Sequence, residues 1–212
     1  MPNASSRGTQ PRRRYAKRLS PADRREQLLD AALSLVAESG FTAVSIAAVA
    51  ERSGVTRPVV YDSFGSRDEV LQELIERETA RMHDAVERSM SAAPPEGTAA
   101  EVVSAALGHF LAEVRAQPST WRLVYFPIDG VPPMLRERVE KARNELRTPL
   151  RHLFADWLAS SPEEAEGIDL DVLVQVLQGM IQTMSRLVLD DPEHYDAERV
   201  LALIGPLFFA ES

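Results

Sequence analysis

Apolar residues recur at helical spacing along most of the chain, and breaks rich in glycine and proline separate the runs. The first run opens at Ser20-Pro21 and stops at Gly40, which suits a serine cap, a proline in the first turn and a glycine exit. Strict alternation of apolar and polar residues, the signal of a half-buried strand, is not found. We therefore predict an all-α fold of about nine helices.

The spacing places these helices in nine ranges. They are 20–39, 45–53, 56–64, 66–90, 98–117, 119–126, 135–157, 169–189 and 192–209. Pro149 lies inside the seventh, so we expect a kink one turn earlier. The eighth, 169–189, is apolar on several faces, which is typical of a helix buried on more than one side.

Two short helices joined by a tight turn are predicted between Ser45 and Phe64. Ser45 and Thr56 can each cap the helix that follows, because a hydroxyl accepts a backbone N–H that the first turn leaves unpaired. Gly54 can take the positive φ of a sharp helix exit, and the small Ala50 suits a close helix crossing. The apolar residues expected beneath that crossing are Ile46, Val49, Val55 and Val60. A small residue, a glycine four positions later and then a valine indicate a helix-turn-helix.

Charge is distributed unevenly along the chain. Residues 1–67 contain 11 Lys and Arg against 6 Asp and Glu, whereas residues 68–212 contain 13 against 26, within a net charge of −8. A basic first third favours a polyanionic partner, and the alternative is chance clustering on solvated faces. Residues 1–19, with six basic residues and no acidic one, are predicted to be a disordered arm that either follows DNA or only aids solubility.

Composition excludes several other classes of protein. The chain has no cysteine, which rules out disulfides and cysteine-rich zinc sites and suits a reducing cytoplasm. No run reaches the roughly 18–20 apolar residues of a membrane span, and the basic start lacks the apolar stretch of a signal peptide. We find no metal-spaced His/Asp/Glu cluster, no phosphate-binding glycine loop and no Ser-His-Asp set. We thus expect a cytoplasmic protein that is not an enzyme and has no metal or cofactor.

The segment GVTRPVVYDSFGSRDEVL, Gly54–Leu71, resembles the TetR family of transcriptional regulators. The resemblance is strong over Leu28–Leu74, and beyond it only the number and lengths of the helices agree. After the predicted disordered arm (1–19), it implies a DNA-binding helix-turn-helix head (20–65) and a helical ligand-binding and dimerisation body (66–212), in a protein that forms a dimer. It also implies that a small molecule in the body releases the protein from its DNA operator.

Seven residues are implied to bind DNA by their match to the family pattern. They are Ser45, Thr56, Arg57, Pro58, Val59, Tyr61 and Arg67. Arg57 would bond the O6 and N7 atoms of a guanine, Pro58 would press on a thymine methyl group, and Tyr61 would reach a phosphate or base. Ser45 and Thr56 would hold phosphates at helix N-termini, and Arg67 replaces the family's usual lysine at the DNA backbone.

Each of these roles has a structural alternative. Tyr61 could pack in the core, Arg57 could be a solvated surface residue, and Ser45 could be a cap without a phosphate. Asp62 departs from the pattern, because an acidic group disfavours phosphates. It could accept from a cytosine amino group or orient Arg57.

Large amphipathic side chains in the body are the candidates for an effector pocket. They are Phe110, Trp121, Tyr125, Phe126, Met134, Trp157, Met180 and Met184, with His109, Arg122, His152 and Gln178 as polar partners. A helical bundle needs such residues in its core as well, so core packing is the alternative. We expect a mainly apolar effector.

The last two helices carry more apolar surface than one chain can cover. We expect a homodimer built as a four-helix bundle from residues 169–189 and 193–209, with Gly179 allowing close approach. The resulting hypothesis is a ligand-responsive regulator, in the first instance a repressor, that binds a palindromic operator as a dimer. One alternative is a DNA-binding regulator whose body only dimerises, and a remote one is a helical enzyme acting on a hydrophobic substrate.

Overall fold

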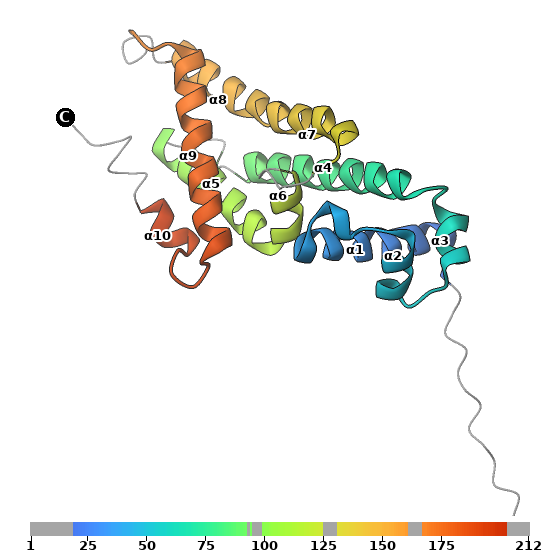
Figure 1. Cartoon of the computed structure of the whole chain (residues 1–212). Helices are drawn as coiled ribbons and strands as arrows, with labels where there is room; N and C mark the ends of the chain where they lie inside the picture. The colour runs from blue at the N-terminus through green and yellow to red at the C-terminus, as the bar shows by residue number, and fades with distance from the viewer. Residues whose placement is uncertain (1–18, 93, 95–98, 125–130, 161–166, 203–212) are drawn as a thin grey trace, which may run out of the picture.

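The structure, a computed structural model, describes residues 19–92, 94, 99–124, 131–160 and 167–202. The predicted all-α class is confirmed, since these residues form helices and connections without a strand (Figure 1). The elements are α1 (Pro21–Ser39), the 3-10 helix η1 (Phe41–Ala43), α2 (Ile46–Ser53), α3 (Arg57–Ser63), α4 (Arg67–Ser91), α5 (Ala99–Ala116), α6 (Pro118–Val124), α7 (Pro133–Glu145), α8 (Arg147–Ser160), α9 (Leu170–Asp190) and α10 (Ala197–Leu201).

The long seventh helix of the prediction is two helices. α7 ends at Glu145 and α8 starts at Arg147, so the expected kink is a break at Leu146. Pro149 explains its position, because proline has no N–H to donate to the carbonyl four residues earlier, which is that of Glu145. This break accounts for ten α-helices in the described residues where the pattern predicted about nine.

The start of the last helix was also predicted wrongly. α10 begins at Ala197 and not at Pro192, because the Asp196 carboxylate accepts the Arg199 N–H at 2.7 Å and caps the helix there. The preceding residues turn, with Tyr195 N donating to the Asp191 carbonyl at 2.9 Å. Residues 203–209 of the predicted helix lie outside the described part of the chain, as do residues 125 and 126 of the sixth.

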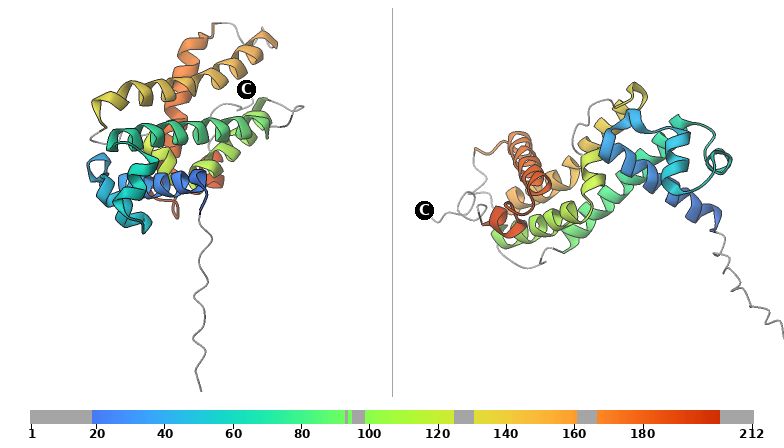
Figure 2. Two further views of the ribbon diagram at one scale, coloured as in Figure 1. Left: turned by 90° about the vertical axis from the view of Figure 1, so that its right-hand side faces the viewer. Right: turned by 60° about the horizontal axis from the view of Figure 1, so that its bottom comes forward.

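α4 is the long element that joins the head to the body. Its first turn follows α3, and its length then runs past α1 and α6 to α5 (Figure 1). α7 and α8 follow each other above α4, and α9 crosses this layer steeply (Figure 2). One buried apolar cluster extends from Leu28 in α1 through Leu74 in α4 to Leu135 in α7, so head and body share a core. The boundary near residue 65 stays a prediction.

A buried carboxylate connects the head to the body through polar contacts. The side chain of Glu78, in the middle of α4, is fully buried. It accepts from Arg77 Nε at 2.8 Å and from the Thr120 hydroxyl of α6, and Arg81 Nη1 lies 3.3 Å away. Arg77 also donates to Glu26 of α1 at 3.0 Å. A buried charge is stable only when it is paired and hydrogen-bonded, and here α4 and α6 supply the partners of Glu78 while α1 holds Arg77.

Candidate nucleic-acid interface

The α2–turn–α3 unit has the local geometry that the sequence predicted. Ser45 Oγ accepts the Ala48 N–H at 3.1 Å and caps α2. Gly54 has φ 69°, a left-handed conformation that glycine adopts without a Cβ clash. Beyond the turn, Val55 N donates to the Ala50 carbonyl at 3.0 Å. These bonds pair the carbonyls at the end of α2 and fix the direction in which α3 leaves the turn.

The apolar side of the unit is buried as expected. Val49 and Val60 have no exposed surface, and Ala50 is nearly as buried at the crossing of the two helices. Ile46 and Val55 are partly buried against the same core. Burial of Val60 fixes the rotation of α3 about its own axis and so determines which residues face outward.

Thr56 does not make the capping hydrogen bond that we predicted. It occupies the N-cap position of α3 with an extended backbone, but its side chain accepts no cap bond. The reason lies in Pro58, which has no N–H at the second helical position, while Val59 N donates to the Thr56 carbonyl at 3.0 Å instead. DNA phosphate contact by Thr56 stays a prediction.

The outward side of α3 carries the residues predicted to read bases. Arg57 and Pro58 are exposed in its first turn, and Tyr61 is 56% exposed one turn later. Val59 is half-buried, and Asp62 is exposed beside Tyr61. In Figure 1 and in the right-hand view of Figure 2, α3 and α9 lie toward opposite ends of the molecule. Entry of the exposed side of α3 into a DNA groove stays a prediction.

Arg67 has intramolecular partners in addition to its predicted role at the DNA backbone. Its Nε donates to the Val44 carbonyl at 2.7 Å and its Nη2 to the Phe41 carbonyl at 2.9 Å. The guanidinium thus ties the start of α4 to the segment before α2. Phosphate binding by Arg67, which remains a prediction, would have to share these donors.

A capping arrangement at the start of α4 connects it rigidly to α3. Ser66 Oγ accepts the Glu69 N–H at 3.1 Å, and Glu69 Oε2 accepts the Gly65 N–H at 2.8 Å. The predicted capping box is therefore present, with its second bond directed to the residue before the cap. The two hydrogen bonds leave a short, capped connection between α3 and α4.

Sequence reasoning missed Arg25, which holds the other end of α3. Its guanidinium donates to the Ser63 carbonyl and to Glu73, and it lies over the Phe64 ring at 4.4 Å. Arg25 and Glu73 are 48 positions apart. No spacing rule within one helix could have paired them.

The predicted effector residues are distributed over several environments. Phe110 and Trp121 pack edge to face with ring centroids 4.9 Å apart, and Trp121 is fully buried in the main core. Met184 belongs to a second buried cluster between α5 and α9. Met134 is 48% exposed at the start of α7, so the described part of the body does not enclose it.

The remaining members of that set are Trp157, Met180, Tyr125 and Phe126. Trp157 is half-buried and packs edge to face on Phe154 of α8, with ring centroids 6.1 Å apart. Met180 is half-buried against the second cluster. Tyr125 and Phe126 lie outside the described residues. Their role in an effector pocket stays a prediction.

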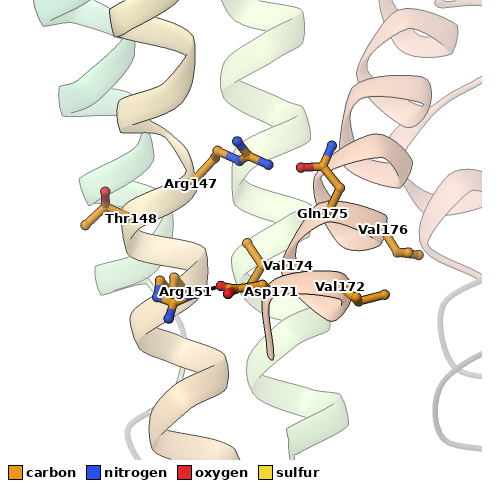
Figure 3. Close-up of a pocket in the computed structure, with 8 residues that line it drawn as sticks. All are labelled: Arg147, Thr148, Arg151, Asp171, Val172, Val174, Gln175 and Val176. Atoms are coloured by element: carbon orange, nitrogen blue, oxygen red, sulfur yellow. Dashed lines mark hydrogen bonds and ion pairs between the residues drawn. The ribbon is translucent and has the colours of Figure 1, made fainter. Parts of the chain in front are cut away.

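A groove of about 630 Å³ lies elsewhere, between α8 and α9 (Figure 3). It is lined by Arg147, Thr148, Arg151, Asp171, Val172, Val174, Gln175 and Val176. Arg151 pairs with Asp171 across it. None of the six predicted pocket residues that the structure describes lines this groove, and its open form differs from an enclosed effector cavity.

Comparison with known proteins agrees with this geometry. Residues 28–74, from α1 to the middle of α4, match the bacterial regulatory proteins of the tetR family. The HTH-type transcriptional regulator BetI of Klebsiella pneumoniae is 26% identical over 156 residues, covering 73% of this chain and 80% of the relative.

Two solved structures share the fold. A TetR-like transcriptional regulator from Rhodococcus sp. RHA1 has a TM-score of 0.68 at 24% identity, over 89% of this chain and 95% of that one. The regulator FadR from Bacillus subtilis, in complex with stearoyl-CoA, has a TM-score of 0.60 at 18% identity, over 84% and 96%. The matched proteins are regulators of transcription. Residues 28–74 of this chain are therefore similar to the DNA-binding region of tetR-family transcriptional regulators, and the chain shares the fold of the two solved regulators.

Proposed function

We propose that this regulator is a repressor, which binds a palindromic operator as a dimer and leaves it when a small, mainly apolar effector occupies the body. The observation that carries the proposal is the outward side of α3, where Arg57, Pro58 and Tyr61 are exposed while Val60 is buried. An exposed arginine in the first turn of a recognition helix can bond one guanine through two N–H groups. Such a pair contributes roughly 1–3 kcal/mol of discrimination between bases.

The test is selection of a preferred duplex from random DNA by the purified protein. We expect an inverted repeat, and we expect Arg57→Ala to lower the preference for it over scrambled DNA by about tenfold, since 1.4 kcal/mol is tenfold in affinity. Arg115→Ala, at an exposed position of α5 in the body, is the matched control and should leave the preference unchanged. No selected sequence, or an unchanged preference in Arg57→Ala, would contradict the proposal.

The proposed dimer uses the exposed side of α9. Val172 and Val176 are 59% and 54% exposed, and Gly179 and Thr183 continue the same side at spacings of three and four residues. A Cβ added at Gly179 would meet nothing within 4 Å, so the single chain gives no packing reason for glycine there. A glycine inside a helix costs about 1 kcal/mol relative to alanine, and close approach of a second helix explains it.

For this dimer we propose a different partner of α9 from the helix that the sequence suggested. The sequence predicted residues 193–209, but residues 193–196 are not helical and α10 packs against α5, where Leu201 Cδ1 would lie 3.1 Å from a Cβ at Gly108. α8 runs beside α9, and the groove between them lies next to the exposed valines. We therefore propose α8 and α9 of two copies as the bundle. α9 is also long and apolar enough to cross a membrane, a test that helices packed in soluble assemblies pass equally.

The apolar effector is supported by the composition of the body and by one neighbour in fold. FadR of Bacillus subtilis was solved in complex with stearoyl-CoA, a ligand with a long apolar chain. Bound effector would move α4 and alter the spacing of the two α3 helices, which must enter major grooves about 34–36 Å apart. A coupling of roughly 1–3 kcal/mol is sufficient for release.

Thermal shift with fatty acids and acyl-CoAs of increasing chain length tests the effector. A rise in melting temperature that grows with ligand concentration, together with release of the selected duplex, is expected. Stabilisation without release would indicate a pocket uncoupled from DNA. No stabilisation by any apolar compound would favour a body that only dimerises.

A further inference from the structure

The C-terminal end of α3 is held by a side chain from α1. Arg25 Nη1 donates to the carbonyl of Ser63, the last residue of α3. The carbonyls of a helix's last turn have no partner within the helix, and the helix dipole makes that end negative. α3 has no basic residue in its last turn. Arg25 supplies from outside the cation that α3 lacks.

The same guanidinium is fixed from two further directions. Its Nε lies 3.2 Å from Glu73 Oε2, its Nη2 bonds Glu73 Oε1, and Glu69 Oε1 lies 3.9 Å away. The guanidinium carbon Cζ of Arg25 lies 4.4 Å from the centre of the Phe64 ring, which is fully buried between α3 and α4. A planar fork with five donors can satisfy a carbonyl, a carboxylate and a ring face together, whereas a lysine ammonium cannot.

α3 depends on such outside contacts because it is short. It has seven residues, and its N-cap Thr56 makes no side-chain cap bond. Isolated helices shorter than about 12 residues are not stable in water. The buried Val60 fixes how α3 rotates, and the bonds of Gly54 and Val55 fix its first turn. The far end of α3 is held by the buried Phe64, by the capped connection to α4 and by the contacts of Arg25, of which only those of Arg25 reach its last carbonyl from another helix.

We propose that Arg25 is a positioning residue that sets the angle at which α3 enters the DNA groove, and so determines sequence preference without touching a base. The proposal rests on the readout by α3 described above. Hydrogen bonds to base edges need donor–acceptor distances and angles that a tilted helix loses. Attraction to phosphates depends on charge and hardly on tilt. Loss of Arg25 should therefore weaken specific binding much more than non-specific binding.

The experiment compares affinities for two duplexes at one salt concentration, the duplex selected by the wild-type protein and a scrambled one of equal length. Arg25→Met keeps most of the side-chain length and removes the fork. We expect it to bind the selected duplex about tenfold more weakly or worse, and the scrambled duplex less than about twofold more weakly. Arg25→Lys keeps the charge. Its logarithmic preference for the selected over the scrambled duplex should be closer to that of Arg25→Met than to that of the wild type.

Arg88→Met is the matched control. Arg88 forms a two-bond fork with Glu113, at 3.1 and 3.0 Å, between α4 and α5 in the body. The Arg88→Met variant removes the same kind of ion pair at a distance from α3. It should leave the ratio of the affinities for the selected and the scrambled duplex unchanged. Should Arg25→Met fail to fold, Glu73→Gln decides, because it frees the guanidinium from its carboxylate and should reduce the ratio by about threefold.

Three outcomes would overturn the inference. They are equal loss of affinity for both duplexes, an unchanged ratio in Arg25→Met or its substitute Glu73→Gln, and full recovery by lysine. Arg57→Ala keeps this inference distinct from the proposed function. If Arg57→Ala abolishes the preference and the Arg25 variants do not change it, the positioning role alone is wrong. If Arg57→Ala has no effect, the readout by α3 is wrong as well.

Discussion

The head and the body of this molecule complete their hydrophobic cores to different degrees. In the head, Leu28, Val60 and Phe64 are fully buried by neighbours from the same chain. In the body, α8 has no fully buried residue, and α9 exposes Val172 and Val176 although its sequence is apolar on several faces. Within the described residues the head is thus buried by its own chain, whereas α8 and one side of α9 remain uncovered. This difference agrees with our proposal that the head reads DNA and that the body pairs two copies.

The largest effect should come from charging the uncovered side of α9. Val172→Arg with Val176→Arg would place two unpaired cations where we propose that a second copy packs. A buried charge without a partner costs about 3–5 kcal/mol, so the double variant should be monomeric at micromolar concentration and bind the selected duplex at least 100-fold more weakly. Sedimentation velocity measures the oligomeric state, and DNA titration measures the affinity for the selected duplex.

Glu140→Arg with Glu137→Arg, at exposed positions of α7, is the control for this variant because it changes charge away from α9. It should remain a dimer. A dimer formed by the α9 double variant would show that the second copy packs elsewhere.

A smaller effect is expected when the same substitution is made in both regions. Phe64→Ala in the head removes a fully buried ring and should lower the free energy of unfolding by about 3–5 kcal/mol. Phe154→Ala in α8 removes a half-buried ring and should cost less than about half of that. Urea unfolding of both variants, at a protein concentration where the wild type is dimeric, measures the difference. Equal losses would mean that α8 is as well packed in the dimer as the head is.

The two regions also differ in how much their sequence predicts. The head follows from local signals, since the cap at Ser45, the positive φ of Gly54 and the capping box at Ser66 depend on neighbours within a few residues. Thr56 failed as a cap because Pro58 lacks the N–H that its hydroxyl would accept. Arg25 could not be predicted, because its partner Glu73 comes from another helix.

The body depends more on contacts that no local pattern records. Glu78 lies on the buried face of α4 among apolar residues, and its carboxylate is paired by Arg77 of the same helix and by Thr120 of α6, which no local pattern identifies. Pro149 indicated a kink near Leu146, and the structure has a full break there between α7 and α8. Apolar residues of α9 predicted burial, and those at 172 and 176 are buried only if a second copy covers them.

The buried contact between α6 and α4, beneath the head, should show an intermediate effect. Thr120→Val removes the hydroxyl that donates to the buried Glu78 carboxylate while keeping the side-chain shape. Leaving a buried acceptor without its donor costs about 1–3 kcal/mol, so the variant should lower the free energy of unfolding by that amount. Thr42→Val, at an exposed position of the head, is the matched control and should change it by less than about 0.5 kcal/mol. An unchanged stability in Thr120→Val would show that the Glu78 carboxylate is satisfied without α6.

The smallest effect should come from an exposed pair in the body, and it should depend on pH. The hydrogen bonds from Arg88 lower the pKa of Glu113 below its usual value of 4.5. A carboxylate with a lowered pKa in the folded protein stabilises it above the pKa of the unfolded chain, and this contribution is lost as pH falls through the folded value. Glu113→Gln should therefore be slightly less stable than wild type near pH 7. The two proteins should be equally stable at a pH where Glu113 of the wild type is protonated in both the folded and the unfolded protein. Thermal unfolding from pH 7 to pH 3 measures this convergence, and a stability difference that stays constant over that range would show that the ion pair contributes nothing in solution.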